Sequence, residues 1–172
     1  HVAVHLELRA RFDEENNLKW KRVLEDEGVH VYVGLPHMKV HAKLCIIKKV
    51  VKNKISNYGF ISTGNFNEKT ARLYGDECLR TANKKILQDV NNIFEYLEAP
   101  EYKAHALKQC KPLPVSPLTM RTHFIKLIED EIKLAKRKKP AKIIIKLNSL
   151  VDQVLIGKLY EAAHFGVEVN LI

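Results

Sequence analysis

Residues 2–34 have the order strand, helix, strand, and residues 141–172 repeat it, which restricts the fold more than any other feature of the sequence. In the first copy, apolar and polar residues alternate over 2–8 and 29–34, as they do in strands. The segment between them carries an apolar stripe and ends at Gly28, a residue typical of helix ends. Strands joined by such a crossover lie parallel. We therefore predict an α/β fold.

The middle of the chain adds a predicted hairpin and a further helix. Two apolar runs, 39–51 and 56–63, flank the polar segment Lys-Asn-Lys, which predicts a hairpin. A strand is expected over 76–82. Residues 84–99 have the period of an amphipathic helix, which Pro100 should end. The apolar stripe of that helix consists of Ile86, Val90, Ile93, Phe94 and Leu97.

The strand and helix patterns are interrupted once, over residues 101–117. This segment holds three prolines and shows no periodicity, so we predict a linker there. It separates a first domain, residues 1–100, from residues 118–172, the beginning of a second, similar α/β unit. Ser116 is expected to cap a helix of this second part. The similar patterns of the two parts suggest an internal duplication.

Composition narrows the choice of partners without selecting one. Lysine and arginine exceed aspartate and glutamate by 29 to 20, a net charge of +9, which favours an anionic partner. The three cysteines form no Cys-x-x-Cys pair, so zinc ribbons and disulfide frameworks are not expected. A cytoplasmic setting fits, with association with a membrane surface left open. Because the chain begins without Met and both ends fall inside strand patterns, we expect a piece of a longer protein.

A histidine and a lysine lie two residues apart at the front of the apolar run MKVHAKLCII. On a strand, residues i and i+2 point to one face, so His41 and Lys43 are expected side by side. A neutral imidazole is a nucleophile, and a neighbouring ammonium disfavours the imidazolium. The same ammonium can bind an incoming anion. Most His-x-Lys pairs on strands are structural, yet this arrangement suits attack on phosphorus.

A second polar element, STGNFN at 62–67, follows the next predicted strand and leads into a predicted helix. Gly64 allows a close approach of the backbone, and helix N-terminal N–H groups bind phosphate oxygens. Asn65 and Asn67 add amide donors, and Asn65 with Glu68 resembles a capping box. A cap and a turn would explain the same residues without any ligand. If the two strands form a hairpin, both polar elements lie at the same end of it.

In combination, the two elements resemble the first half of a phospholipase D-type active site. Longer strings resemble polyphosphate kinase of the first family, namely ELRARFDEENN, VHVYVGLPHMKVHAKL, STGNFNEKTARLYGDECLRTA, DVNNIFEYLE and KLNSLVDQVLIGKLYEAAHFGVEVNL. They occur in the family's order. The resemblance covers nearly the whole chain and is weakest across 100–116 and 133–142.

This resemblance implies a fold and an activity. The fold would be a phospholipase D-like mixed sheet flanked by helices, followed by the start of a second such domain. The activity would be reversible transfer of the terminal phosphate of ATP to inorganic polyphosphate, with Mg²⁺ and a phosphohistidine intermediate. His41 matches the phosphorylated histidine, and Lys43 would bind the phosphoryl oxygens. The implied partners are inorganic polyphosphate and ATP or ADP, with a homo-oligomer in the full-length protein, no nucleic acid and no transmembrane segment.

The resemblance also implies roles for two residues outside these elements. Arg11 matches an arginine at the family's metal–phosphate site, and because a guanidinium is itself a cation we interpret it as a phosphate clamp. Tyr74 matches a tyrosine that contacts the nucleotide. The family's Tyr-Thr-Asp is Tyr74-Gly75-Asp76 here, which should loosen the helix exit without loss of activity. Since a second essential histidine would follow residue 172, the chain alone is expected to be inactive.

Two other classes of function stay open at this stage. A phospholipase D-type phosphodiesterase acting on lipid or nucleic acid would use the same histidine, but such sites usually have an aspartate about four residues beyond the lysine. Lys43 is followed by LCIIKKVV, which contains no acid. A non-catalytic basic module would instead bind polyphosphate or nucleic acid in a salt-dependent manner that does not need His41.

Overall fold

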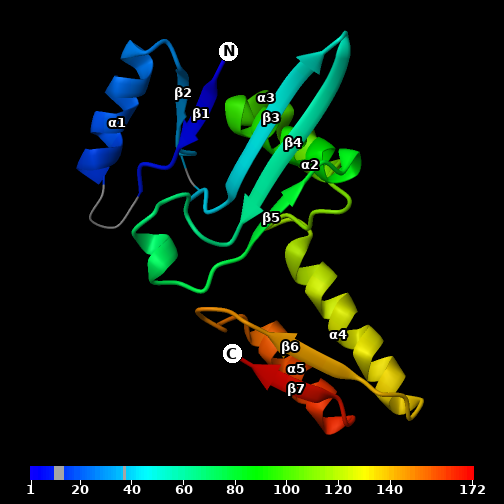
Figure 1. The fold of residues 1–172 in the computed structure, drawn as a ribbon. Helices are drawn as coiled ribbons and strands as arrows, with labels where there is room; N and C mark the ends of the chain where they lie inside the picture. The colour runs from blue at the N-terminus through cyan, green and yellow to red at the C-terminus, as the bar shows by residue number, and fades with distance from the viewer. Residues whose placement is uncertain (10–13, 37) are drawn as a thin grey trace. The chain divides into compact units, whose positions relative to one another are not determined.

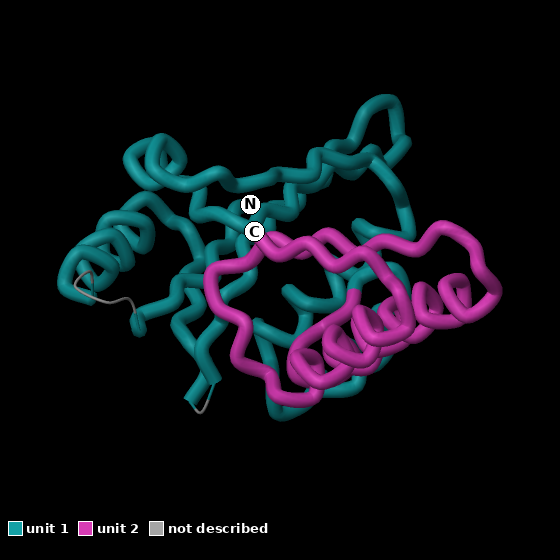
Figure 2. The backbone as a smooth tube through the Cα atoms, turned by 90° about the horizontal axis from the view of Figure 1, so that it is seen from below, with its two compact units in different colours: residues 1–113 teal, residues 114–172 magenta. Residues whose placement is uncertain are grey.

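The computed structural model describes residues 1–9, 14–36 and 38–172. The chain forms two compact units, residues 1–113 and 114–172, which are coloured separately in Figure 2. Each unit combines helices and strands, so the predicted α/β class is confirmed. Arg11 lies outside the described residues. Within those residues, no helix combines the length and apolar character that a membrane span requires.

Unit 1 begins with the predicted strand–helix–strand element (Figure 1). Strand β1 (Ala3–Leu6) pairs in parallel with β2 (His30–Val33), and helix α1 (Glu14–Asp26) connects them. Gly28 ends this helix in the left-handed region, with φ of +76°, and its N–H donates to the Glu25 carbonyl at 2.9 Å. The glycine C′ role predicted from the sequence is therefore confirmed.

The predicted hairpin is formed by β3 (Lys43–Val51) and β4 (Lys54–Ser62), and β5 (Cys78–Thr81) pairs with β4 on its other side. Both turn residues, Lys52 and Asn53, have positive φ angles, 49° and 59°. Two consecutive residues of this conformation match the right-handed twist of the flanking strands, which is why two-residue hairpins use them. The three strands form an antiparallel sheet.

The phospholipase D-like mixed sheet implied by the family resemblance stays a prediction for unit 1. Among the described residues, β1 and β2 form one sheet, and β3, β4 and β5 form a second. The connection from β2 to β3 runs as a loop in which Leu35 and Met38 make an isolated bridge. Both parallel and antiparallel strand pairs therefore occur in unit 1, but in two separate sheets of the described residues.

Helix α2 (Lys84–Glu98) packs against the hairpin and supplies the buried centre of unit 1. Asn83 caps it, with its side-chain oxygen accepting from the N–H groups of Lys85 and Ile86 at 3.0 and 3.3 Å. A Cβ on Gly59 of β4 would collide with the side chain of Leu87, so glycine at that position permits the close packing of helix on strand. The predicted stripe is buried at Val90 and Leu97 and half-buried at its other positions.

The expected linker at 101–117 is wrong over its first half, where helix α3 (Pro100–Lys108) forms and packs against α2. Pro100 ends α2 as predicted, but it also occupies the first turn of α3, where a missing N–H costs nothing. Asp89, which is 3% exposed, then holds the following segment: its Oδ2 accepts from the N–H groups of Lys111 and Leu113, each at 2.9 Å. Residues 100–113 are therefore part of unit 1.

Unit 2 contains α4 (Met120–Lys136), β6 (Lys142–Ile145), α5 (Gln153–His164) and β7 (Glu168–Leu171), and its two strands pair in parallel as predicted. Its core consists of Ile128, Ile132, Leu159, Ala162 and Val167. The predicted Ser116 cap is wrong, because α4 begins four residues later and Thr119 stands at the cap position.

Replacing Asp89 with Ala should lower the free energy of unfolding of unit 1 by about 2–3 kcal/mol, because two backbone donors lose a charged acceptor. Urea unfolding followed by the fluorescence of Trp20, the single tryptophan, measures this, since Trp20 lies in unit 1. Glu98→Ala, at the exposed end of the same helix, is the matched control. A loss below about 0.5 kcal/mol for Asp89→Ala would show that this carboxylate does not hold the segment.

Candidate active site

His41 and Lys43 lie together at the start of β3. The prediction that His41 lies on the strand is wrong, because β3 begins at Lys43 and His41 precedes it. The two side chains nevertheless meet, with Lys43 Nζ 3.0 Å from His41 Nδ1. Lys43 Nζ also donates to the His41 carbonyl at 2.7 Å. The imidazole is exposed and Lys43 is half-buried, so the ring is accessible while the amine is held beside it.

The contact with Lys43 determines the state of the His41 ring. An ammonium has no lone pair, so a charged Lys43 can only donate to Nδ1, and this contact favours the tautomer of the neutral ring that is protonated on Nε2. The positive charge of Lys43, then partial burial and the charge of Lys39 together lower the pKa of His41 below its usual 6.5. The ring is therefore neutral at pH 7 and carries the lone pair that a nucleophile needs.

Lys43 is itself subject to opposing influences. Burial lowers the pKa of Lys43, the charge of Lys39 lowers it further, and the carboxylate of Asp76 opposes both. Asp76 stands just before β5, so an acid distant in sequence faces the lysine. In the sequence Asp76 is recognisable only as part of the Tyr74-Gly75-Asp76 motif, because its electrostatic role depends on the folding of the 63–77 loop.

The register of the hairpin brings the two polar elements to the same end of it, as predicted. Lys43 is paired with Ser62 in the β3–β4 ladder, so the residues before Lys43 and those after Ser62 leave the sheet at one edge. The loop 62–67 therefore begins beside the His41–Lys43 pair. A hairpin with any other register would move these groups apart by about 3.3 Å for each residue of slip.

The structure gives a different reason for glycine at position 64 from the one predicted. Its backbone is buried, and a Cβ at this position would collide with the side chain of Asp76. Its N–H donates to Ser62 Oγ at 3.1 Å, and the neighbouring Thr63 Oγ1 donates to Asp76 Oδ1 at 3.0 Å. The close approach that glycine permits is thus made by a carboxylate of the same chain.

The predicted helix after the loop is only a short 3-10 turn, η1 (Thr70–Arg72). Asn67, not Asn65, has the capping role, since its Oδ1 accepts from the N–H groups of Lys69 and Thr70 at 3.0 and 3.1 Å. The expected capping box of Asn65 with Glu68 is therefore wrong. Asn65 is exposed and lines the adjoining pocket.

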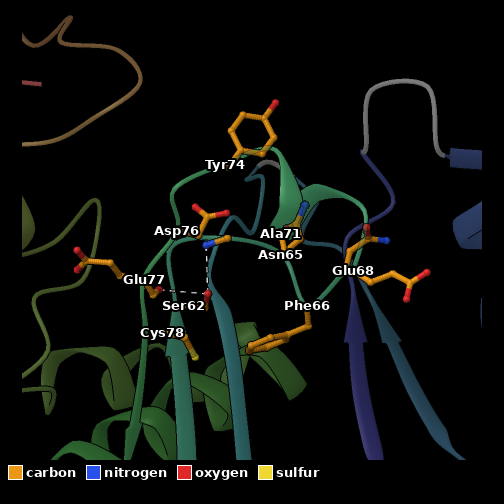
Figure 3. A pocket seen from close by; sticks show the side chains of 11 residues that line it. Ser62, Asn65, Phe66, Glu68, Ala71, Tyr74, Asp76, Glu77 and Cys78 are labelled. Atoms are coloured by element: carbon orange, nitrogen blue, oxygen red, sulfur yellow. Dashed lines mark hydrogen bonds between the residues drawn. The ribbon is translucent and has the colours of Figure 1, made fainter.

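A pocket of about 350 Å³ opens beside this loop (Figure 3). Two exposed aromatic side chains line it, Phe66 at 60% and Tyr74 at 59% exposure. In Figure 3 the ring of Tyr74 projects away from the other lining side chains. Phe66 was missed by sequence reasoning, although an aromatic residue between two asparagines of a polar loop is a usable signal. The remaining lining residues are Ser62, Gly64, Asn65, Asn67, Glu68, Ala71, Asp76, Glu77 and Cys78.

The described residues offer no cage for a metal ion. Among those side chains, no group of three or more His, Cys, Asp and Glu residues could hold one. Three carboxylates, those of Glu68, Asp76 and Glu77, line the pocket, but Asp76 is engaged by Thr63. This donor set does not fit a dedicated protein site for Mg²⁺, which prefers octahedral oxygen coordination.

Comparison with known proteins identifies the family of the chain. The family description "Polyphosphate kinase C-terminal domain 1" matches residues 1–103, and "Polyphosphate kinase C-terminal domain 2" matches residues 113–172. A polyphosphate kinase of Vibrio parahaemolyticus is 45% identical over 172 residues, which are 100% of this chain and 24% of that protein. One from Staphylococcus epidermidis is 43% identical over 171 residues, 99% of this chain and 23% of that protein.

A solved structure is similar over the same extent. The crystal structure of polyphosphate kinase from Porphyromonas gingivalis superposes with a TM-score of 0.74 at 36% sequence identity, over 99% of this chain and 28% of that one. Sequence and fold thus agree along nearly the whole length of the chain. Two relatives are 43–45% identical to this chain, and two consecutive domain descriptions of one family match it. The chain therefore belongs to the polyphosphate kinase family.

Proposed function

We propose that this chain is part of an enzyme that transfers the terminal phosphate of ATP reversibly to inorganic polyphosphate through a phosphohistidine at His41. The observation that carries the proposal is the exposed imidazole of His41, whose Nδ1 lies 3.0 Å from Lys43 Nζ. Membership in the polyphosphate kinase family supports the substrates. The chain spans 24% of the length of the Vibrio relative, so the reaction belongs to the longer polypeptide.

The proposed reaction has two transfers. Lys43 turns from His41 Nδ1 to the oxygens of the γ-phosphate, which frees the lone pair of the ring for attack on phosphorus. A P–N bond forms, the bond from phosphorus to the bridging oxygen breaks, and ADP leaves with that electron pair. The terminal oxygen of a polyphosphate chain then attacks the same phosphorus, and the P–N bond returns its electrons to His41. Lys43 offsets the negative charge that develops in both steps.

The loop after β4 supplies the proposed contacts to phosphate. Asn65 is exposed at the pocket, and the Nδ2 group of Asn67 is the end of its amide that can donate, since the oxygen caps η1. Gly64 would contribute indirectly, because its own N–H is bonded to Ser62 and the space over its Cα admits the Asp76 side chain, which shapes the loop. We assign these three residues to phosphate binding, with Asn65 as the principal donor.

Tyr74 is the proposed contact for the nucleotide, and its 59% exposure leaves the ring free to stack on a base or ribose. Arg11 remains the proposed phosphate clamp. Mg²⁺ would be held mainly by the phosphates of ATP, the usual way in which this ion binds in nucleotide sites. When bound there, it would neutralise phosphate charge.

The remaining proposals concern the longer polypeptide. We propose that the two sheets of unit 1 correspond to a phospholipase D-like domain and that unit 2 is the beginning of a second. An active site shared between two such domains would leave the 172 residues alone inactive. A cytoplasmic homo-oligomer that does not bind nucleic acid fits this function.

Replacing His41 with Ala in the full-length protein that contains this chain should abolish acid-labile phosphate incorporation from labelled ATP. The reason is that the nitrogen that forms the phosphoramidate is removed. His105→Ala, at an exposed histidine of α3, is the matched control and should leave labelling unchanged. Labelling that persists in His41→Ala would move the nucleophile elsewhere, and labelling from a phosphodiester would favour the phosphodiesterase alternative.

Replacing Lys43 with Met should raise the pKa of His41 toward 6.5, because the largest cause of its depression is removed. The acid limb of the phosphorylation rate should then move to higher pH, and the rate at pH 7 should fall about 100- to 1000-fold with the loss of charge stabilisation. NMR titration of the His41 ring, assigned by its absence in His41→Gln, measures the pKa directly. Lys39→Met should give a smaller shift. Equal titration in wild type and Lys43→Met would contradict the electrostatic argument.

A further inference from the structure

The carboxylate of Glu7 is bonded to the backbone directly before the proposed nucleophile. Glu7 follows β1, and its Oε2 accepts from the N–H of Val40 at 2.6 Å. Its other oxygen, Oε1, accepts from the N–H of Arg9 at 2.8 Å. Val40 lies 33 residues away in the sequence and immediately precedes His41. The end of the first strand therefore holds the segment that carries the imidazole.

The same loop is held at two further points. Where it leaves β2, the N–H of Gly34 donates to the Leu6 carbonyl of β1 at 3.0 Å. In its middle, Arg9 Nη2 donates to the Pro36 carbonyl at 2.6 Å. The loop from β2 to β3 is thus attached to the end of β1 at its start, its middle and its end. Val40 is the last of these attachments before His41.

Neither packing nor strand pairing fixes the position of His41. Its ring is exposed, and β3 begins two residues later. Lys43 is held by its pairing with Ser62, so the relative position of the two side chains depends on where the chain enters β3. The Val40–Glu7 bond holds the chain directly before that point, and the bond from Lys43 Nζ to the His41 carbonyl holds it at His41 itself. Hydrogen bonds to an ionised carboxylate are roughly twice as strong as neutral ones, which suits such an anchor.

Glu7 is in the charged form that this role requires. Burial acts to raise the pKa of Glu7, but the backbone donors of Arg9 and Val40 and the charges of Arg9 and Lys39 lower it below its usual value. The carboxylate therefore stays ionised at neutral pH. Within the described part of the chain, the side-chain hydrogen bonds of Glu7 go to backbone N–H groups and not to the side chains of His41 or Lys43.

We propose that Glu7 is a positioning residue for phosphoryl transfer, which holds the backbone at Val40 so that the His41 ring meets Lys43. This inference rests on the proposed function for its kinetic consequence. Its structural consequence stands separately: the β1–β2 sheet and the β3–β5 sheet are linked at the site by a charged hydrogen bond. Removing the link leaves both sheets formed and releases the segment between them.

Three variants of this chain test the proposal by NMR. In Glu7→Ala the Val40 amide should exchange with solvent about 10- to 100-fold faster, because it loses a charged acceptor. The His41 pKa should rise toward 6.5 as the ring leaves Lys43. Glu7→Gln retains one acceptor oxygen for two donors and should lie between wild type and Glu7→Ala in both measurements. Glu27→Gln, an equal change of charge at an exposed acid, should match wild type.

The kinetic test uses the full-length protein that contains this chain. Glu7→Ala should lower kcat for polyphosphate formation about 10- to 100-fold, the cost of a misplaced reacting group. KM for ATP should change by less than about twofold, since Glu7 does not reach the nucleotide pocket. Glu7→Gln should recover part of kcat, a rescue that general destabilisation would not produce.

Two results would overturn the proposal. The first is a Val40 amide as protected in Glu7→Ala as in wild type. The second is a deprotected Val40 amide with the His41 titration and kcat both unchanged. If Glu7→Ala does not fold, the same comparisons of Val40 amide exchange, His41 titration and kcat are made with the isosteric Glu7→Gln. Should His41→Ala retain full labelling, the proposed function fails, while amide exchange and ring titration still decide whether Glu7 positions the segment.

Discussion

The ladder between β3 and β4 is the interaction on which the candidate site depends. Its register pairs Lys43 with Ser62, so the chain before β3 and the chain after β4 emerge together. Helix α2 packs closely on this hairpin because Gly59 carries no side chain where Leu87 approaches. The reactive end of the sheet is therefore supported from one side by a buried helix and stays open to solvent at its edge.

Electrostatics at this edge result from a small number of charges in a basic chain. The charge of Lys43, partial burial and the charge of Lys39 lower the pKa of His41, and Asp76 partly compensates the lysine charge. Asp76 also fills the space above Gly64 and accepts a hydrogen bond from Thr63. One carboxylate thus shapes the loop and balances the ammonium. The phospholipase D-type pattern would have placed an acid shortly after the lysine, and here the acid comes from a distant part of the sequence.

Several predictions were correct because they rest on local rules. The parallel β1–β2 pair, the Gly28 helix end, the hairpin at Lys52 and Asn53, and the start of unit 2 as a second α/β element all follow from periodicity and turn preferences. Others were wrong because a local signal had two interpretations. Pro100 can end one helix and begin the next, and the polar loop 62–67 contains two asparagines that could each cap a turn.

The sequence by itself determined the α/β class, the order of the elements apart from α3, and the pairing of His41 with Lys43, because these depend on short-range patterns and residue chemistry. Only the tertiary structure decided that Asp89 holds residues 111–113, that Asp76 faces Lys43 and that Glu7 holds Val40. Each of these contacts joins residues far apart in the chain. The sequence does not indicate which distant N–H group or cation a carboxylate will contact, because that partner is determined by how the sheets and helices pack.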